Sequence, residues 1–342
     1  MWWRVRPDNG SGVVNIAAIA LTAALAFVAG FACRKGSICA VLAARELVSE
    51  GRSRRMISFL TGSLAAALVT IPLAWTFPGS VELAPSFQLT WWVLLGGAIF
   101  GTGALINGGC AFGTLVQIAG GNLSFLAIVP GIAMGYVLAA AIPGHEPRAA
   151  EPILALAKPG MAAFVAFATL LAIATALAVL TLRDREISGA AMKRWLRSPD
   201  WRPGEATLVM GAVAGFLYAF AGKWTYIDFL SGVSVPASGG LTAMAAAGCA
   251  ALVSGAVAAA LVSGKFKLRG PTPGQGLRSL IGGVLFGIGA SFVPGGNDTM
   301  VLHLLPALTL HGIAAYGAML FVLTLVLALA PATAAKAMPR KP

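Results

Sequence analysis

Long apolar stretches recur from one end of this sequence to the other, and this pattern leaves few folds open. Nine of them have full length: about 12–32, 55–77, 89–107, 122–143, 160–182, 205–222, 239–263, 277–293 and 310–332. Each is close to the roughly 20 residues that a helix needs to cross a bilayer. Only 11% of the 342 residues are charged, whereas a soluble domain carries about a quarter. The sequence therefore predicts an all-α polytopic membrane protein, built as a single membrane domain over 1–342.

Four shorter apolar stretches follow polar or glycine-rich breaks: about 37–48, 109–119, 225–234 and 297–306. A helix of that length is too short to cross a bilayer. Irregular backbone at membrane depth is tolerated only where it is buried in protein or lines a cavity, so such pieces are typical of re-entrant helices. We therefore expect the four breaks to line the pathway of a solute.

The basic residues predict how the chain is oriented. Nineteen of the 24 Lys and Arg residues fall in four regions: 33–55, 183–204, 264–278 and the C-terminal tail. With nine crossings and an outside N-terminus, all four regions lie on the same side. Because Lys and Arg collect in cytoplasmic loops, we expect the N-terminus outside and the C-terminus in the cytoplasm. The same rule accounts for the net charge of +12, so membrane lipid is the expected partner and nucleic acid is not.

One phrase occurs twice in the chain. GGAIFGTGALINGGCAFG starts at Gly96, and GGVLFGIGASFVPGGNDT starts at Gly282. The copies belong to two repeat units of about 12–143 and 205–332, and the stretch at about 160–182 connects them. A single connecting span would insert the second unit upside down. Inverted repeats whose broken helices meet near the midplane of the bilayer are typical of transporters.

The repeat leads to two further expectations. The matched GxxxG spacings, Gly97–Gly101 and Gly283–Gly287, should let helices approach closely. A weaker alignment lays FACRKGSICAVL at 31–42 over FAGKWTYIDFL at 220–230, and it places Asp228 opposite Cys39.

The second glycine pair of each phrase leads into a short helix. The first copy reads Gly108, Gly109, Cys110, and the second reads Gly295, Gly296, Asn297. Cys39 occupies a similar place after the first break. A helix N-terminus offers unpaired N–H groups and the positive end of a dipole, which suits an anion. A cysteine in a membrane helix is also a common apolar filler, and the residues alone leave the two interpretations open.

Four charged residues lie next to the breaks. Arg34 and Lys35 either anchor the topology or attract an anion at the inner mouth. Asp228 and Asp298 are ionisable groups near membrane depth, where such groups are costly and mark solute or proton pathways. Their short segments could also be wet near an aqueous mouth, so both interpretations stay open.

Several kinds of chemistry find no support in the sequence. The four cysteines form no CxxC pair and no zinc spacing, and we interpret Cys33 and Cys249 as packing residues. No P-loop, nucleophile elbow or H-E-x-x-H motif is present. The sequence therefore predicts no cofactor and no enzyme.

Three segments carry a resemblance to a known family: GFACRKGSICAVLAARELV at 30–48, LINGGCAFGTL at 105–115 and VPGGNDTMVLHLLPALTLHG at 293–312. They resemble the YeeE/YedE sulphur transport family of bacterial inner-membrane proteins. The resemblance implies an hourglass-shaped protein with nine spanning and four short helices, which takes up thiosulfate. It implies that Cys39 and Cys110 relay the anion through S–H···S hydrogen bonds, and that Asn297 stands where a third cysteine is expected. A small soluble sulphur-carrier protein is an implied partner.

The leading hypothesis is thus a transporter that brings a thiosulfate-like sulphur anion into the cytoplasm. Asn297 indicates either a different substrate or an amide that donates hydrogen bonds to an oxyanion. A second hypothesis is a sulphur-handling membrane enzyme or subunit in which Cys39 or Cys110 is a nucleophile. A third is a channel for another small solute, with the cysteines as packing residues.

Overall fold

The computed structural model describes residues 16–81, 83–182, 194–222, 224–235 and 242–330. Throughout these residues the protein is built from helices, and isolated bridges are the only β pairing. The all-α prediction is therefore confirmed.

The N-terminal half contains α1 (Ile16–Lys35), α2 (Ala40–Glu50), α3 (Arg54–Thr76), α4 (Trp91–Asn107), α5 (Ala111–Ala119), the 3-10 turn η1 (Leu123–Ala127) and α6 (Ile128–Ala140). After α7 (Met161–Leu182), the C-terminal half contains α9 (Pro203–Phe220), α10 (Tyr226–Ser234), α11 (Ala243–Val262), α12 (Pro273–Phe292), α13 (Asn297–Thr299), the π-helical turn η3 (Met300–Leu304) and α14 (Leu310–Leu329). All four short stretches are helical, as α2, α5, α10 and α13 with η3.

Eight segments of the described residues are long and apolar enough to cross a membrane. A ninth is reached if Pro273–Phe292 and Asn297–Leu304, which meet at an angle of 50°, count as one bent span. The first turns of α12 carry Gln275 and Arg278, which lower its hydropathy. The structure thus confirms a multi-pass protein, while the count of nine, the re-entrant character of the short helices and the hourglass outline stay predictions.

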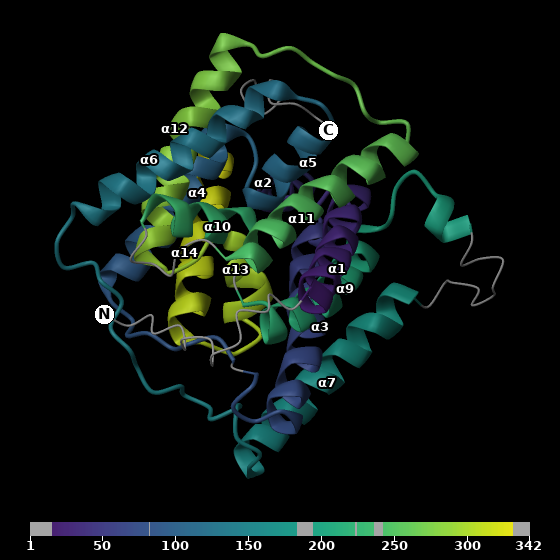
Figure 1. Ribbon diagram of the computed structural model, residues 1–342, viewed down its shortest axis with the longest axis vertical. Coiled ribbons are helices and arrows are strands. Elements are labelled where there is room, and N and C mark those ends of the chain that lie inside the picture. Colours follow the sequence, from purple (N-terminus) through teal and green to yellow (C-terminus); the bar gives the residue numbers. More distant parts are fainter. Residues whose placement is uncertain (1–15, 82, 183–193, 223, 236–241, 331–342) are drawn as a thin grey trace.

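The two halves interleave rather than stand apart (Figure 1). Helix α1 packs along α11, and α3 packs along α9; α6 packs along α12, and α4 along α14. The helices α1, α3, α4 and α6 correspond in order to α9, α11, α12 and α14. Exchanging each helix for its counterpart converts the α1–α11 pair into α9–α3, and the α6–α12 pair into α14–α4. Helices α4 and α12 also cross each other, as do α1 and α9. This is the packing that a two-fold repeat would give, although the inversion and the unit boundaries stay predictions.

Glycines permit the closest of these crossings. A side chain on Gly97 would collide with the backbone of Ala315, and one on Gly283 would lie 3.0 Å from the Cα atom of Gly131. The expected close approach at both GxxxG spacings is therefore confirmed. At the α4–α12 crossing, Phe100 and Phe286 stack with ring centroids 4.2 Å apart. These two rings hold the same position in the two copies of the repeated phrase.

The connecting helix α7 lies at the edge of the molecule, where α3 is its main contact (Figure 1). The ring of Trp75 packs between Phe164 and Phe167, and its indole nitrogen donates to the carbonyl of Leu156 at 2.7 Å. The basic residues of 183–193, the N-terminal segment before Ile16 and the tail after Ala330 lie outside the described residues, so the orientation of the termini stays a prediction.

Candidate functional site

Glycines form the sharp turn between α4 and α5. Gly108 ends the helix with a φ of 82°, a conformation that glycine adopts without strain. The side-chain amide of Asn107 then donates to the carbonyl of Gly109 and to the hydroxyl of Thr114, both at 2.8 Å. These bonds fold the chain sharply, so that Cys110 becomes the N-cap of α5.

Cys39 is the N-cap of α2, so the two cysteines hold equivalent places. Both are buried, with 5% of Cys39 and none of Cys110 exposed. Their thiols interact with each other. The first backbone N–H of α2, from Ala40, also donates to the Cys110 sulphur at 3.1 Å. The structure therefore brings together two predicted site residues that are far apart in sequence.

Gly113 makes this contact possible, and sequence reasoning did not single it out. A Cβ atom on Gly113 would lie 2.5 Å from the Cys39 sulphur. Helix α5 therefore has room for the Cys39 thiol only because position 113 has no side chain. The stretch Cys110-Ala-Phe-Gly113 places this glycine almost one turn after the N-cap.

Asn297 reaches the same place from the C-terminal half. It is fully buried, and its side-chain oxygen accepts the first N–H of α5, from Ala111, at 3.1 Å. Because an N–H donor must face an acceptor, this bond fixes which way the amide points. The amide nitrogen of Asn297 has no hydrogen-bond partner among the described residues. A buried donor is thus left over at the position where the relay pattern has a third cysteine.

The two aspartates lie together at the break before α10. Thr225 is the N-cap of α10, and its hydroxyl donates to Asp228 at 3.1 Å. Thr299 of α13 donates to the same carboxylate at 3.2 Å. Asp298 is 3% exposed and also contacts the Thr225 hydroxyl. Thr225, rather than Asp228, therefore holds the position that Cys39 holds in α2.

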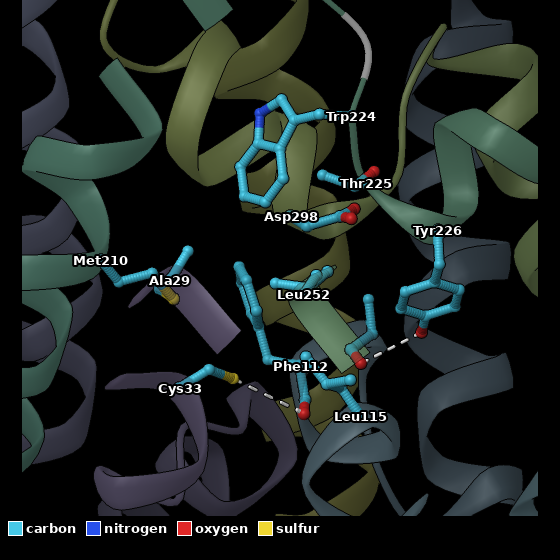
Figure 2. A pocket seen from close by; sticks show the side chains of 11 residues that line it. Ala29, Cys33, Phe112, Leu115, Met210, Trp224, Thr225, Tyr226, Leu252 and Asp298 are labelled. Carbon is cyan, nitrogen blue, oxygen red and sulfur yellow. Dashed lines mark hydrogen bonds between the residues drawn. The ribbon is translucent and has the colours of Figure 1, made fainter. Parts of the chain in front are cut away.

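A small cavity lies between Cys33 of α1 and Asp298 of α13 (Figure 2). Its volume is about 10 Å³, which is room for one water molecule. Cys33 and Phe112 line it from one side, and Trp224, Thr225 and Asp298 from the other. The Cys33 thiol donates to the carbonyl of Phe112 at 4.0 Å. This cavity is thus too small for a solute larger than water.

A second, larger hollow lies against α2, with a volume of about 410 Å³. We call it the basic vestibule; its charged lining residues are Lys35, Arg45, Glu46, Glu50, Arg55, Asp200 and Lys265. Lys265 pairs with Asp200 at 2.5 Å. The buried Nε of Arg45 has no hydrogen-bond partner among the described residues, and its charge acts on the Cys39 thiol. Arg45 therefore connects the vestibule to the cysteines.

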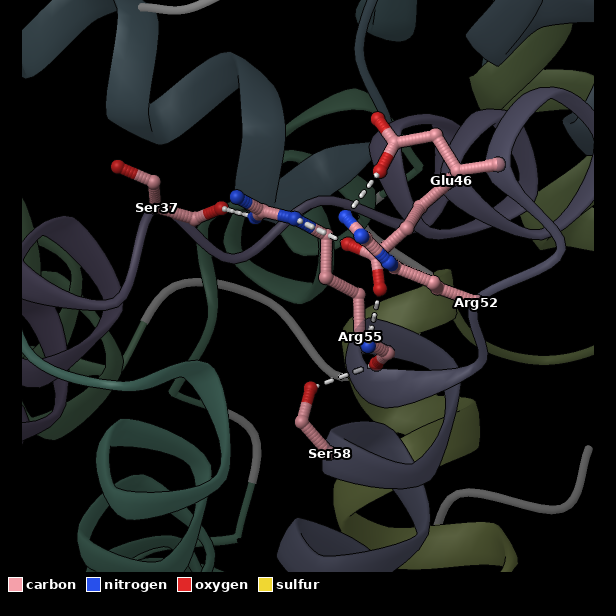
Figure 3. Close-up of polar contacts among 6 residues, drawn as sticks. Ser37, Glu46, Arg52, Arg55 and Ser58 are labelled. Carbon is pink, nitrogen blue, oxygen red and sulfur yellow. Dashed lines mark hydrogen bonds and ion pairs between the residues drawn. The ribbon is translucent and has the colours of Figure 1, made fainter.

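Arg55 links the loop between α1 and α2 to the helix α2 (Figure 3). Its guanidinium donates to the carbonyl of Ser37 at 3.0 Å and pairs with Glu46 at 3.1 Å. Ser37 has a positive φ of 47°, an uncommon conformation for a residue with a side chain. The clamp holds the break in place, so Arg55 is a positioning residue for α2.

The predicted basic pair ends α1, and both side chains are buried. The ammonium of Lys35 is already engaged, because it donates to the carbonyl of Ser198 at 2.7 Å and lies 5.4 Å from the centre of the Phe31 ring. The Nε of Arg34 has no hydrogen-bond partner among the described residues. This arrangement favours anchoring for Lys35, while the role of Arg34 in attracting an anion stays a prediction.

Some participants could have been found from sequence. Thr225 and Asp228 form a T-x-x-D pattern, which is a signal for a helix N-terminus. Tyr226, whose hydroxyl donates to the carbonyl of Ala111 at 3.0 Å, gives no such signal because its partner is distant in the chain.

Comparison with known protein families gives one match. A family model described as sulphur transport covers residues 35–325 of the chain. The matched region contains all four short helices and every residue of the closed centre except Ala29, Cys33 and Arg34. No curated protein matches the chain.

Proposed function

The chain belongs to the YeeE/YedE sulphur transport family, and from that premise we propose that it carries a thiosulfate-like sulphur oxyanion into the cytoplasm. The proposal is supported by the N-termini of α2 and α5, which meet at the closed centre. Helix N-termini stabilise anions through unpaired N–H groups and the helix dipole. The centre adds donors to this field, in the form of two thiols and one free amide.

The donors suggest an order of contacts. Asn297 meets the anion from the outer side, Cys110 and Cys39 pass it inward, and Arg45 receives it at the vestibule. Asn297 is bonded to Ala111, the residue after Cys110, the Cys110 and Cys39 thiols interact with each other, and the charge of Arg45 acts on Cys39. Each donor can release the anion to the next without leaving it unsolvated, which is what a buried ion requires.

Asn297 in place of a third thiol favours an oxygen of the substrate over its terminal sulphur at the first step. An amide N–H is a stronger donor than a thiol. Because the Asn297 oxygen is held by Ala111, only the NH₂ group is available. An oxyanion of sulphur fits this donor, and the sulphur end of thiosulfate would then face Cys110.

The observation that carries the proposal is the bond from the Ala40 N–H to the Cys110 sulphur. The sulphur occupies the place at a helix N-terminus where an incoming anion would sit. A substrate that displaces this contact gains the same N–H donor together with the thiol hydrogen. Removal of the Cys110 sulphur should therefore affect transport far more than folding.

The test is uptake of labelled thiosulfate into cells that lack their own importers, which compares the wild type with Cys110→Ala. The expected loss is about 30-fold or more, since an unsatisfied buried hydrogen bond costs roughly 1–3 kcal/mol and two such bonds are broken. Cys249→Ala is the matched control, because Cys249 lies in α11 and is partly exposed. Absence of uptake by folded wild-type protein, or full uptake by Cys110→Ala, would sink the proposal.

A second candidate function is acceptance of sulphur by a cysteine, favoured by the contact between the Cys39 and Cys110 thiols. A persulfide trapped on either thiol during turnover, found by mass spectrometry of alkylated protein, would support it. Uptake without any persulfide supports simple transport.

The direction of transport also requires an energy source. Import assumes the predicted orientation in a bacterial inner membrane, with the vestibule facing the cytoplasm and open to a small sulphur carrier. Movement of a dianion inward against about 100 mV costs roughly 4–5 kcal/mol. The transporter therefore needs coupling or trapping inside the cell.

A further inference from the structure

Asp298 is a buried carboxyl group with an unsatisfied oxygen. Its exposed fraction is 3%, and its Oδ1 atom has no hydrogen-bond partner among the described residues. The side chain lines the central cavity, where most other lining groups are apolar, among them Phe112, Leu115 and Leu252 (Figure 2). The backbone N–H groups of Thr299 and Asp298 also contact the carboxyl group, but with one oxygen unpartnered a carboxylate is more costly in such a place than a carboxylic acid.

The hydrogen bonds of the Thr225 hydroxyl also favour a protonated Asp298. The Thr225 hydroxyl lies between two carboxyl groups, because it donates to Asp228 and also contacts Asp298. A hydroxyl has one hydrogen to donate. Once that hydrogen is given to Asp228, the contact with Asp298 is a hydrogen bond only if Asp298 itself supplies a hydrogen. A proton on Asp298 would supply that hydrogen.

A hydrogen-bonded path continues from this pair. Thr299 donates to Asp228, and the hydroxyl of Tyr218 donates to Thr299 at 3.3 Å. The ring of Tyr218 stacks on His303, with centroids 4.2 Å apart. The path joins three elements of the C-terminal half, α9, η3 with α13, and α10.

The other titratable groups that interact with Asp298 are thiol, phenol and carboxyl side chains, and none of these is basic. They are Cys33 of α1, Tyr136 of α6, Tyr218 of α9, and Tyr226 and Asp228 of α10. No ion pair to Asp298 is formed by the described residues. Lys223 lies outside those residues. Among these groups the carboxylate of Asp228 disfavours a second negative charge at Asp298 and favours a proton there.

We propose that Asp298, next to Asp228, binds one proton from the outer side and releases it to the cytoplasm together with the anion, which makes the protein a proton–anion symporter. This inference rests on the proposed transport function. The step balances simply: the carboxylate takes up one H⁺ on loading and loses one H⁺ on release, and no other bond changes. One proton carried with a dianion halves the charge that moves against the membrane potential.

The test uses purified protein in liposomes, with the potential clamped at zero by potassium and valinomycin and with sodium absent. Labelled thiosulfate is the probe, and a pH dye in the lumen reports proton entry. With one coupled proton, each unit of inward pH gradient should raise the accumulation ratio about tenfold, because one pH unit corresponds to a factor of ten in an equilibrium. The lumen should acidify only when thiosulfate is present.

Asp298→Asn mimics the protonated state permanently. It should still equilibrate thiosulfate, but the pH gradient should no longer drive accumulation and the lumen should not acidify. Glu151→Gln, a change at an exposed loop residue, is the matched control and should behave as the wild type. Wild-type uptake without proton entry, or an unchanged pH response in Asp298→Asn, would overturn the symport mechanism.

A readout independent of transport keeps the two proposals apart. The infrared carbonyl band of a buried carboxylic acid should be present in the wild type and in Glu151→Gln, and absent in Asp298→Asn. Absence of the band from wild type across acidic and neutral pH overturns the proton site even if thiosulfate is carried. Presence of the band in protein that carries no thiosulfate supports the proton site and rejects the transport proposal alone.

Discussion

The two central breaks, Asn107 to Cys110 and Pro294 to Asn297, use the same backbone plan and opposite chemistry. In each, a glycine-rich turn ends a long helix and a short helix begins at the centre of the molecule. The first break presents sulphur, as Cys110 in contact with Cys39. The second presents an amide and carboxyl groups, as Asn297, Asp298 and the nearby Asp228. The repeat thus sets where the helices start, while single substitutions decide what each start can bind.

This difference separates two tasks that a coupled transporter must perform. Thiols are soft, weakly hydrated donors that suit the sulphur end of an anion. Carboxyl groups exchange protons and repel anions. Cys39 and Cys110 lie in the N-terminal half and the two aspartates in the C-terminal half, so in the proposed mechanism the thiols and the proton site come from different halves.

The largest expected effect comes from joining the two thiols of the first break. In a variant with Cys33→Ala and Cys249→Ala, only Cys39 and Cys110 remain, and mercuric ion should bridge them because soft metals prefer paired thiolates. The bridge should abolish thiosulfate uptake, and a dithiol should restore it. In variants that retain only one of the two cysteines, mercury bound to the purified protein should be removed by a monothiol, whereas the bridged protein should need the dithiol. Equal behaviour of the single- and double-cysteine proteins would show that the thiols are not in contact.

A smaller loss is expected when the fit between α2 and α5 is disturbed. In Gly113→Ala the new methyl group would overlap the Cys39 sulphur and push the two short helices apart. Uptake should fall about tenfold, in line with the roughly 1–3 kcal/mol cost of overpacking. Gly317→Ala is the matched control, since a methyl group there meets nothing within 4 Å. Similar uptake by both variants would remove Gly113 from the site.

The smallest effect should appear in selectivity rather than rate. Asn297→Cys makes the second break resemble the first, and it removes the acceptor for the Ala111 N–H. Competition by sulfite and sulfate against labelled thiosulfate should weaken by a few-fold, consistent with the roughly 1 kcal/mol that one hydrogen bond contributes. Asn297→Ala separates loss of the amide from gain of the thiol. An unchanged competition profile in both variants would mean that Asn297 does not meet the substrate.

The sequence predicted the parts of this structure that depend on local composition. The predicted stretch 55–77 corresponds to the observed helix Arg54–Thr76, and the predicted stretch 310–332 corresponds to Leu310–Leu329. Length and hydropathy alone identify such helices. The four short helices were also predicted, since glycine pairs mark the starts of α5 and α13 and polar breaks with a single glycine precede α2 and α10. The alignment that set Asp228 opposite Cys39 missed the match, because it compared letters rather than helix caps.

What the sequence could not supply was the set of contacts between distant segments. The bond from Ala111 to Asn297 joins residues 186 positions apart, and no local pattern predicts it. The same holds for Gly113 against Cys39 and for Tyr226 against Ala111. These contacts form only when the two halves pack together. The roles of the site residues therefore depend on tertiary packing, which the helix propensity of a local segment does not predict.

The narrow centre has a consequence for the energetics of the whole cell. The central cavity has room for one water molecule, which is too little for a continuous file of water at this level of the protein. The resting protein should therefore leave the membrane potential intact, whereas an aqueous pore would short-circuit it. A dianion must shed nearly all of its hydration shell to pass, and each turnover then waits for the centre to open. Such a protein works at the pace of a carrier, with a steep dependence on temperature.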